Sequence, residues 1–141
     1  MDAGVDAGVK EASRAWEKDL NCAESALRGV CAGRGIKLSD ESLKLATPFG
    51  GGLGRCEDVC GALSGAIMGI GAELGRTDGQ VDKKPAYAAA KKTYSAFQAE
   101  FGSTSCRVLN KGDFESKEHD VRCKKFVLEA VKFAIQSLDG K

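Results

Sequence analysis

Apolar residues recur at three- and four-residue steps along most of the chain, which is the spacing of one face of an α-helix. β-Branched residues are scattered and no alternation of apolar and polar positions persists, so the pattern does not favour strands. The first periodic segment is followed by glycines and has its apolar positions at Trp16, Leu20, Ala23, Leu27 and Val30. It therefore predicts an amphipathic helix that ends at Gly33 and Gly35.

Two further helices are expected before residue 75. Ser39 suits the N-cap of a short second helix, which ends before Pro48. The third helix is predicted from about Cys56 to Leu74 and carries an apolar stripe and a glycine stripe. The stripes consist of Cys60, Leu63, Ile67, Ile70 and Leu74, and of Gly61, Gly65 and Gly69. Because each glycine inside a helix costs ~1 kcal/mol relative to alanine, the glycine stripe predicts a buried helix that a neighbouring backbone approaches closely.

The second half of the chain predicts two long helices joined by a polar connection. Pro85 suits the first turn of a fourth helix, which ends at Gly102. Residues 102–120 are expected to be irregular, and a fifth helix is expected from about Val121 to Leu138. The inner faces of these two helices consist of Tyr87, Ala90, Tyr94, Phe97 and Phe101, and of Phe126, Ala130, Phe133 or Ala134, and Leu138. The chain is thus expected to be all-α: a single compact domain, residues 1–141, of about five helices around the glycine-striped central helix. Residues 1–10 are expected to be loosely ordered.

Composition narrows the class of protein further. The chain has 141 residues, of which 43% are apolar and 29% charged, as in an ordinary soluble domain. Its net charge of +1 argues against nucleic acid or an anionic membrane as a partner. Residues 1–9 do not have the pattern of a secretory signal, and the longest apolar run, residues 59–70, is too short to span a bilayer. We therefore expect a cytoplasmic protein without membrane insertion.

Cysteine is the residue type that carries the candidate chemistry. The six cysteines are Cys22, Cys31, Cys56, Cys60, Cys106 and Cys123. Stable disulfides are uncommon in the cytoplasm, so these thiols indicate metal ligation, transient redox chemistry or plain buried thiols. No CxxC pair occurs, which counts against zinc ribbons, thioredoxin-like motifs, bacterial-type ferredoxins and c-type haem attachment. A four-sulfur site would have to be assembled from separated segments.

The glycine run from Pro48 to Arg55 does not have the lysine–Ser/Thr ending of a Walker loop and is not a GxGxxG motif. It is better interpreted as a tight crossing beside the Cys60 helix, where side chains would clash. Such a turn also directs backbone amides at a nearby anion, which includes a thiolate or a sulfide. The run therefore predicts amide hydrogen bonds to sulfur.

Residue types other than cysteine and glycine give less evidence about function. His119, the single histidine, precedes Cys123 by four positions and is interpreted as a solvated loop residue rather than a chelating partner. Cys123 falls in the first turn of the predicted fifth helix, where the helix dipole lowers a thiol pKa. If the third helix starts at Cys56, that residue and Cys60 share a helix face. The arginines beside cysteines, which would stabilise thiolates, are Arg55, Arg107 and Arg122. Neither a Ser/His/Asp set nor a recognisable carboxylate pair is present, so a hydrolase is not favoured.

The ordered set of motifs resembles the C-GCAxxG-C-C family of redox-active proteins. The matching pieces are Asn21-Cys22-Ala23, the run Phe49–Gly54, Cys60-Gly61-Ala62-Leu63-Ser64-Gly65, Cys106 and Cys123. The resemblance covers roughly residues 12–138, which would form the family-like helical domain. It implies that the four signature cysteines form the functional set and that Cys31 and Cys56 lie outside it. Related domains in split-Soret cytochromes imply an iron–sulfur centre.

Three functions are consistent with the cysteine pattern and this resemblance. In the first, Cys22, Cys60, Cys106 and Cys123 ligate an iron–sulfur cluster for electron transfer with an unidentified redox partner, and Gly51, Gly52 and Gly61 contribute to cofactor binding. In the second, the protein is a metal-free thiol–disulfide protein with Cys60 and Cys123 as redox thiols. In the third, it is a structural or adaptor domain with inert buried thiols. A homodimer is compatible with each.

Overall fold

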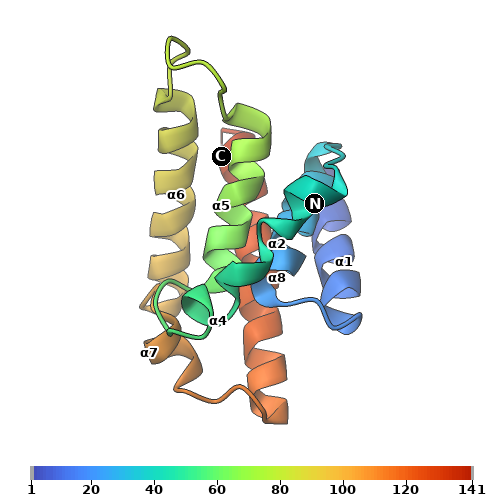
Figure 1. Ribbon diagram of the computed structural model, residues 1–141, viewed down its shortest axis with the longest axis vertical. Helices are drawn as coiled ribbons and strands as arrows, with labels where there is room; N and C mark the ends of the chain where they lie inside the picture. The colour runs from blue at the N-terminus through green and yellow to red at the C-terminus, as the bar shows by residue number, and fades with distance from the viewer. Residues whose placement is uncertain (1, 141) are drawn as a thin grey trace.

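The computed structural model describes residues 2–140, and its regular secondary structure in that range is helical (Figure 1). The long helices are α1 (Ala3–Glu17), α2 (Cys22–Arg34), α5 (Gly61–Leu74), α6 (Lys84–Phe101) and α8 (Lys117–Leu138). The connections hold α3 (Asp40–Lys44), the 3-10 helix η1 (Thr47–Phe49), α4 (Gly50–Leu53) and α7 (Cys106–Asn110). The all-α prediction is confirmed, and the helices in the described range outnumber the five expected.

The first predicted helix is in fact two helices. α1 ends at Glu17, Asp19 has φ 72°, and α2 begins at Cys22. The Asn21 side chain accepts a hydrogen bond from the Glu24 amide at 2.9 Å, and the Glu24 side chain accepts one from the Asn21 amide at 2.9 Å. This capping box fixes a new helix start. The apolar periodicity therefore continues across a break in the backbone.

Residues 1–10 were expected to be loosely ordered; residue 1 lies outside the described residues, and the chain is helical from Ala3 onward. The Asp2 side chain caps α1 by accepting a hydrogen bond from the Gly4 amide at 2.7 Å. α1 and α2 approach closely: a Cβ built on Gly8 would lie 2.7 Å from the Gly29 carbonyl oxygen. This packing against α2, unforeseen from the apolar pattern, holds the segment in place.

α5 lies in the centre of the bundle, with α6 on one side and α2 and α8 packed against its others (Figure 1). Its glycine stripe faces α2. A Cβ on Gly65 would lie 2.8 Å from the Ala23 Cα, and a Cβ on Gly69 would lie 2.6 Å from the Val30 Cγ1. The stripe therefore does what the sequence predicted: it lets a second backbone approach the buried central helix.

Residues 102–120 are more regular than expected, because they contain α7 and the start of α8. Ser116 caps α8 by accepting a hydrogen bond from the His119 amide at 3.1 Å, so this helix begins at Lys117 rather than near Val121. The middle of α8 is buried in the core, with Val127, Val131 and Ile135 fully inaccessible.

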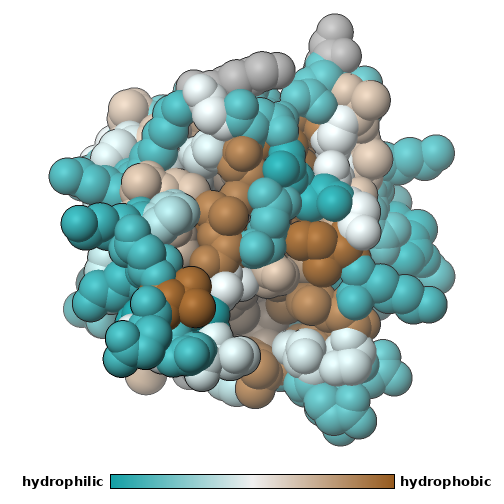
Figure 2. All heavy atoms as spheres, turned by 90° about the horizontal axis from the view of Figure 1, so that it is seen from above, coloured by the Kyte–Doolittle hydropathy of each residue, from teal (hydrophilic) through white to brown (hydrophobic). Residues whose placement is uncertain are grey.

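The surface is mixed in character. On the face shown in Figure 2, apolar side chains are interrupted by polar ones. The large apolar side chains that are exposed are spread over several elements and comprise Leu45, Leu53, Val81, Tyr87, Tyr94, Val108 and Val121. None of the helices between residues 2 and 140 combines the length and the apolar character that a membrane span requires.

Candidate functional site: a cysteine-lined cavity

A cavity of about 460 Å³ lies where α2, α4, α5, α7 and α8 meet, and all four signature cysteines line it: Cys22, Cys60, Cys106 and Cys123. Each comes from a different segment of the chain. The apolar part of the wall includes Leu20, Leu109 and Phe126. The fold therefore brings together thiols that are distant in sequence, in a space large enough for a small ligand.

Three of the four cysteines stand where helices begin. Cys22 is the first residue of α2, Cys60 is the N-cap of α5, and Cys106 is the first residue of α7. The first amides of a helix have no intrahelical acceptor, and the helix dipole is positive at this end. The Cys60 thiol lies against the amides of Ala62 and Leu63. These amides favour negative charge on the sulfur.

The glycine turn lies against two of the sulfur-bearing residues. Gly51 and Gly52 have φ 67° and 72°, a left-handed conformation that makes α4 a turn rather than a regular helix. The Gly51 amide faces the Cys22 thiol. A Cβ on Gly52 would lie 2.8 Å from the Cys106 Cβ, and a Cβ on Gly61 would overlap the Cys22 Sγ. Each glycine predicted to bind a cofactor therefore adjoins a signature cysteine, and its role in cofactor binding stays a prediction.

A short antiparallel contact between two loops joins the segment of Cys60 to the segment of Cys106. The Cys106 amide donates to the Asp58 carbonyl at 2.6 Å, and the Cys60 amide donates to the Thr104 carbonyl at 2.8 Å. An isolated β-bridge joins Val59 to Ser105 between them. Because both segments are held by their backbones, the two cysteines are positioned before any ligand binds.

Cys123 differs from the sequence expectation. Because α8 begins at Lys117, Cys123 lies in its second turn, away from the unpaired amides of the helix start. Burial raises the pKa of Cys123 to about 12, with a further rise from a charged Cys22. The prediction of a thiol with a lowered pKa at this position is therefore wrong.

Burial acts in the same direction on the other three thiols. It raises the pKa of Cys106 to about 11 and also raises the pKa of Cys22 and of Cys60. Negative charge on Cys22 would raise the pKa of Cys60, Cys106 and Cys123 further. All four are consequently neutral thiols near pH 7 when nothing is bound. Cys22 is the residue whose charge affects the pKa of each of the other three.

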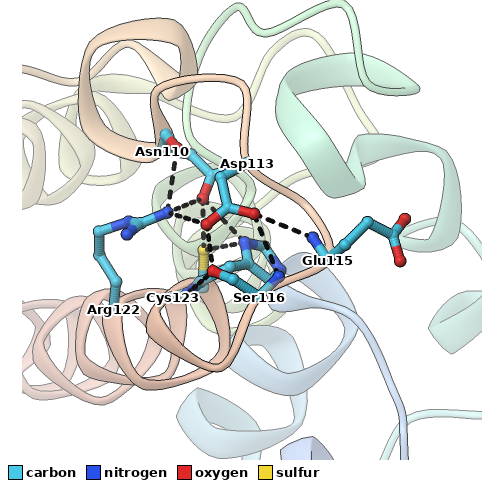
Figure 3. Close-up of polar contacts among 7 residues, drawn as sticks. Asn110, Asp113, Glu115, Ser116, Arg122 and Cys123 are labelled. Atoms are coloured by element: carbon cyan, nitrogen blue, oxygen red, sulfur yellow. Dashed lines mark hydrogen bonds and ion pairs between the residues drawn. The ribbon is translucent and has the colours of Figure 1, made fainter.

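His119 takes part in the site and is not a solvated loop residue, which corrects the sequence interpretation. It is half-buried in the first turn of α8, and its Nδ1 lies 2.8 Å from the Asn110 Oδ1 and 3.4 Å from the Cys123 Sγ. Arg122 donates to the same Asn110 Oδ1 at 2.9 Å and pairs with Asp113 at 3.5 Å (Figure 3). A polar network thus borders Cys123.

The remaining cysteines lie elsewhere. Cys31 is buried in an apolar cluster with Ala23, Leu27 and Ala46, and burial raises its pKa to about 11. Cys56 is exposed in the loop before α5. Because that helix begins at Gly61, Cys56 and Cys60 do not share a helix face, contrary to one sequence alternative.

The three arginines next to cysteines have separate roles. Arg122 lowers the pKa of Cys123, although burial outweighs this effect. Arg107 donates to the Cys56 carbonyl at 3.3 Å. The Arg55 guanidinium stacks over the Phe114 ring, 4.8 Å from its centre, at the cavity wall.

Between residues 2 and 140, the side chains as they stand form no group of three or more His, Cys, Asp or Glu residues ready to hold a metal ion. The sulfurs are arranged around a cavity and not around a single point. A cluster that carries several irons takes its thiolate ligands from its periphery.

Sequence reasoning missed Asn110, which is 1% exposed and lines the cavity. It follows Cys106 by four positions, so both stand on one face of α7. A polar residue at this spacing from a signature cysteine was the available signal. Trp16, the single tryptophan, also lines the cavity and was predicted only as part of an apolar helix face.

Fold and site together define a cysteine-rich protein, helical in its described residues, with four of its six thiols at one cavity. The chain belongs to the family described as "Putative redox-active protein (C_GCAxxG_C_C)", whose profile matches residues 20–137. An uncharacterised protein of Archaeoglobus fulgidus is 29% identical over 146 aligned positions, which cover 92% of this chain and 97% of that protein. No solved structure gives a significant match.

Proposed function

We propose that this protein is an electron-transfer protein in which Cys22, Cys60, Cys106 and Cys123 each supply one thiolate ligand to an iron–sulfur cluster. The observation that carries the proposal is that these four residues, from four separate segments, line one cavity. When bound, such a cluster supplies one-electron transfer at a potential set by its protein surroundings.

The donor set is suited to this group. Thiolates are the soft ligands that iron–sulfur clusters use. The amides of Gly51 and of the first turn of α5 face the Cys22 and Cys60 thiols, and hydrogen bonds of this kind accompany sulfur ligation. The buried Asn110 Nδ2 has no acceptor among the described residues and offers one more donor. Leu20, Leu109 and Phe126 contribute apolar surface to the cavity wall.

The pKa values favour metal ligation over free thiol chemistry. Burial keeps each signature thiol protonated near neutral pH, and a neutral thiol is a poor nucleophile. Coordination to a metal removes the thiol proton and provides the compensating charge inside the cavity. A thiolate-ligated cluster also requires reduced cysteines, which a compartment such as the cytoplasm maintains. The electron donor and acceptor are unidentified redox partners.

The test is purification without oxygen, followed by iron and sulfide analysis and a visible absorption spectrum. We expect bound iron and acid-labile sulfide, and loss of both when Cys22, Cys60, Cys106 or Cys123 is replaced by serine. Cys56→Ser is the matched control, because Cys56 is exposed and outside the cavity, and it should keep the full iron content. Metal-free, colourless wild-type protein under these conditions would contradict the proposal.

A thiol–disulfide function is the second candidate, and the electrostatic coupling of the thiols favours it. Charge on Cys22 raises the pKa of Cys60 and of Cys123, which indicates that these sulfurs are neighbours. In this case two thiols form a disulfide and pass two electrons and two protons to a partner disulfide. Loss of two titratable thiols after mild oxidation, without any metal, would support it. Full function after serine substitution at all four positions would instead indicate a structural or adaptor domain.

A further inference from the structure

Asn110 is one of few fully buried polar residues in the described range, and it lies between two signature cysteines. It is the last residue of α7, which begins with Cys106, and its side chain reaches the part of α8 that carries Cys123. Only 1% of its surface is exposed, and it lines the cysteine cavity. Its side-chain amide is therefore part of the wall that any bound group would meet.

The orientation of this amide is fixed by Arg122. The Arg122 Nη2 lies 2.9 Å from the Asn110 Oδ1 and 3.0 Å from the Asn110 carbonyl oxygen. Arginine can only donate hydrogen bonds, so the atom that faces it is the oxygen. Arg122 is itself held by Asp113 at 3.5 Å (Figure 3). The His119 Nδ1 lies 2.8 Å from the Asn110 Oδ1, and with the oxygen in this position it is the nitrogen that carries the proton.

The Oδ1 atom of the Asn110 amide accepts these hydrogen bonds, so the partner of the Nδ2 atom remains to be identified. Asn110 Nδ2 is inaccessible to solvent and has no acceptor among residues 2–140. A buried donor without a partner is costly, and native proteins seldom retain one without a reason. Asn110 lines the cysteine cavity, so a group bound there is the candidate acceptor for Nδ2.

We propose that Asn110 Nδ2 donates a hydrogen bond to a sulfur of the bound cluster and that Arg122 and His119 hold the amide in the orientation for it. The inference rests on the proposed function. Hydrogen bonds to the sulfurs of a cluster stabilise its more negative, reduced state and so raise its reduction potential. Asn110 is thus a positioning residue that sets the potential, and it does not ligate iron.

The first test compares reduction potentials at equal iron content. Asn110→Leu removes the donor without adding charge, and Asn110→Asp keeps an oxygen opposite Arg122 and His119 while replacing the donor by an acceptor. Both should shift the potential to more negative values. Thr93→Val is the matched control: Thr93 is fully buried on α6, its hydroxyl bonds to the Ala89 carbonyl and to Ser137, and it does not line the cavity. The reduction potential of the Thr93→Val variant should equal that of the wild type.

The second test detects the hydrogen bond itself and needs no stability comparison. The sequence holds two asparagines, Asn21 and Asn110, and the Asn21 side-chain nitrogen already donates to the Thr47 carbonyl at 3.0 Å. Protein labelled with ¹⁵N in asparagine side chains is reduced and studied by pulsed electron paramagnetic resonance. A ¹⁵N coupling to the cluster should appear in wild type and be absent in Asn110→Leu.

The outcomes separate the two proposals. Iron-loaded wild type without ¹⁵N coupling, or iron-loaded Asn110 variants with the wild-type potential, would overturn the role of Asn110 and leave cluster binding intact. Wild type without iron would overturn both proposals, and the iron analysis reveals this result before any resonance measurement.

Discussion

Replacing Gly61 by alanine tests whether the first turn of α5 is shaped around the Cys22 sulfur. A Cβ at this position would overlap the Cys22 Sγ, lie 2.8 Å from the Phe49 carbonyl oxygen and lie 3.4 Å from the Gly50 Cα. The sulfur and the turn that carries Phe49 therefore have to move together. The Sγ can rotate about χ1, whereas the Phe49 carbonyl belongs to the backbone and moves only if the turn itself shifts.

The expected magnitude follows from two opposing effects. Overpacking of a filled space costs about 1–3 kcal/mol, whereas alanine gains at most ~1 kcal/mol over glycine in a helix interior. Gly61 is the first residue of α5, so this gain is smaller there. We expect the metal-free protein to lose about 1–2 kcal/mol of unfolding free energy. Binding sites tolerate displacements of only ~0.5 Å, so iron content should fall as well.

Gly71→Ala is the matched control in the same helix. Gly71 is exposed, and a Cβ there would meet no atom within 4 Å. The change should stabilise the protein by up to ~1 kcal/mol and leave iron content unchanged. Urea unfolding under reducing conditions and iron analysis measure both quantities. If Gly61→Ala retained full iron and were as stable as Gly71→Ala, the close fit between α5 and Cys22 would be refuted.

Further predictions concern packing, thiol reactivity and pH. Gly65→Ala should destabilise the fold more than Gly61→Ala, as urea unfolding would show. The new Cβ would lie 2.8 Å from the Ala23 Cα and 2.9 Å from the Ala23 carbonyl carbon, and these backbone atoms cannot rotate away. In the metal-free native protein, a thiol reagent at pH 8 should modify Cys56 rapidly and the other five slowly, as mass spectrometry would show; two fast sites would contradict this result. Burial raises the pKa of Cys31 and Cys106 to about 11, above the ~8.5 of an unfolded thiol, so the unfolded state loses its protons first as pH rises. Unfolding free energy of the metal-free protein should therefore be level up to about pH 8 and then fall by up to about 1.4 kcal/mol per pH unit for each buried thiol, which urea midpoints between pH 7 and 10 would reveal.

The all-α class and the buried central helix could be predicted because both depend on the spacing of apolar residues and glycines along the chain. The positions of Leu63 and Ile70 on one face of α5, and of Gly65 and Gly69 on another, follow from the period of the helix itself. The break between α1 and α2 was missed because the apolar spacing continues through it. The signal was a local one, Asn21 followed by Glu24, which marks a capping box at a new helix start.

The site could be predicted only in part, because its contacts join elements that are distant in sequence. The family resemblance singled out the four cysteines that line the cavity. The orientation of Asn110, in contrast, depends on Arg122 and His119 after α7 and α8 have packed. The pKa of Cys123 was wrongly predicted for a related reason. The position of a residue within a helix depends on where the helix begins, and the Ser116 cap moves that start to Lys117.

Burial raises the pKa of the signature thiols, whereas the backbone amides at helix starts lower it. The balance between these two effects indicates which chemistry the cavity favours. Burial dominates, so Cys22 and Cys60 stay protonated although backbone amides face both of them. Those amides stabilise sulfur strongly only when it carries charge, as it does when a metal replaces the proton. An arrangement of this kind suppresses the free thiolate, which reacts with oxidants, and favours the ligated one. The amides at α2, α5 and the Gly51 turn therefore support the proposed metal ligation more than they support exchange between free thiols.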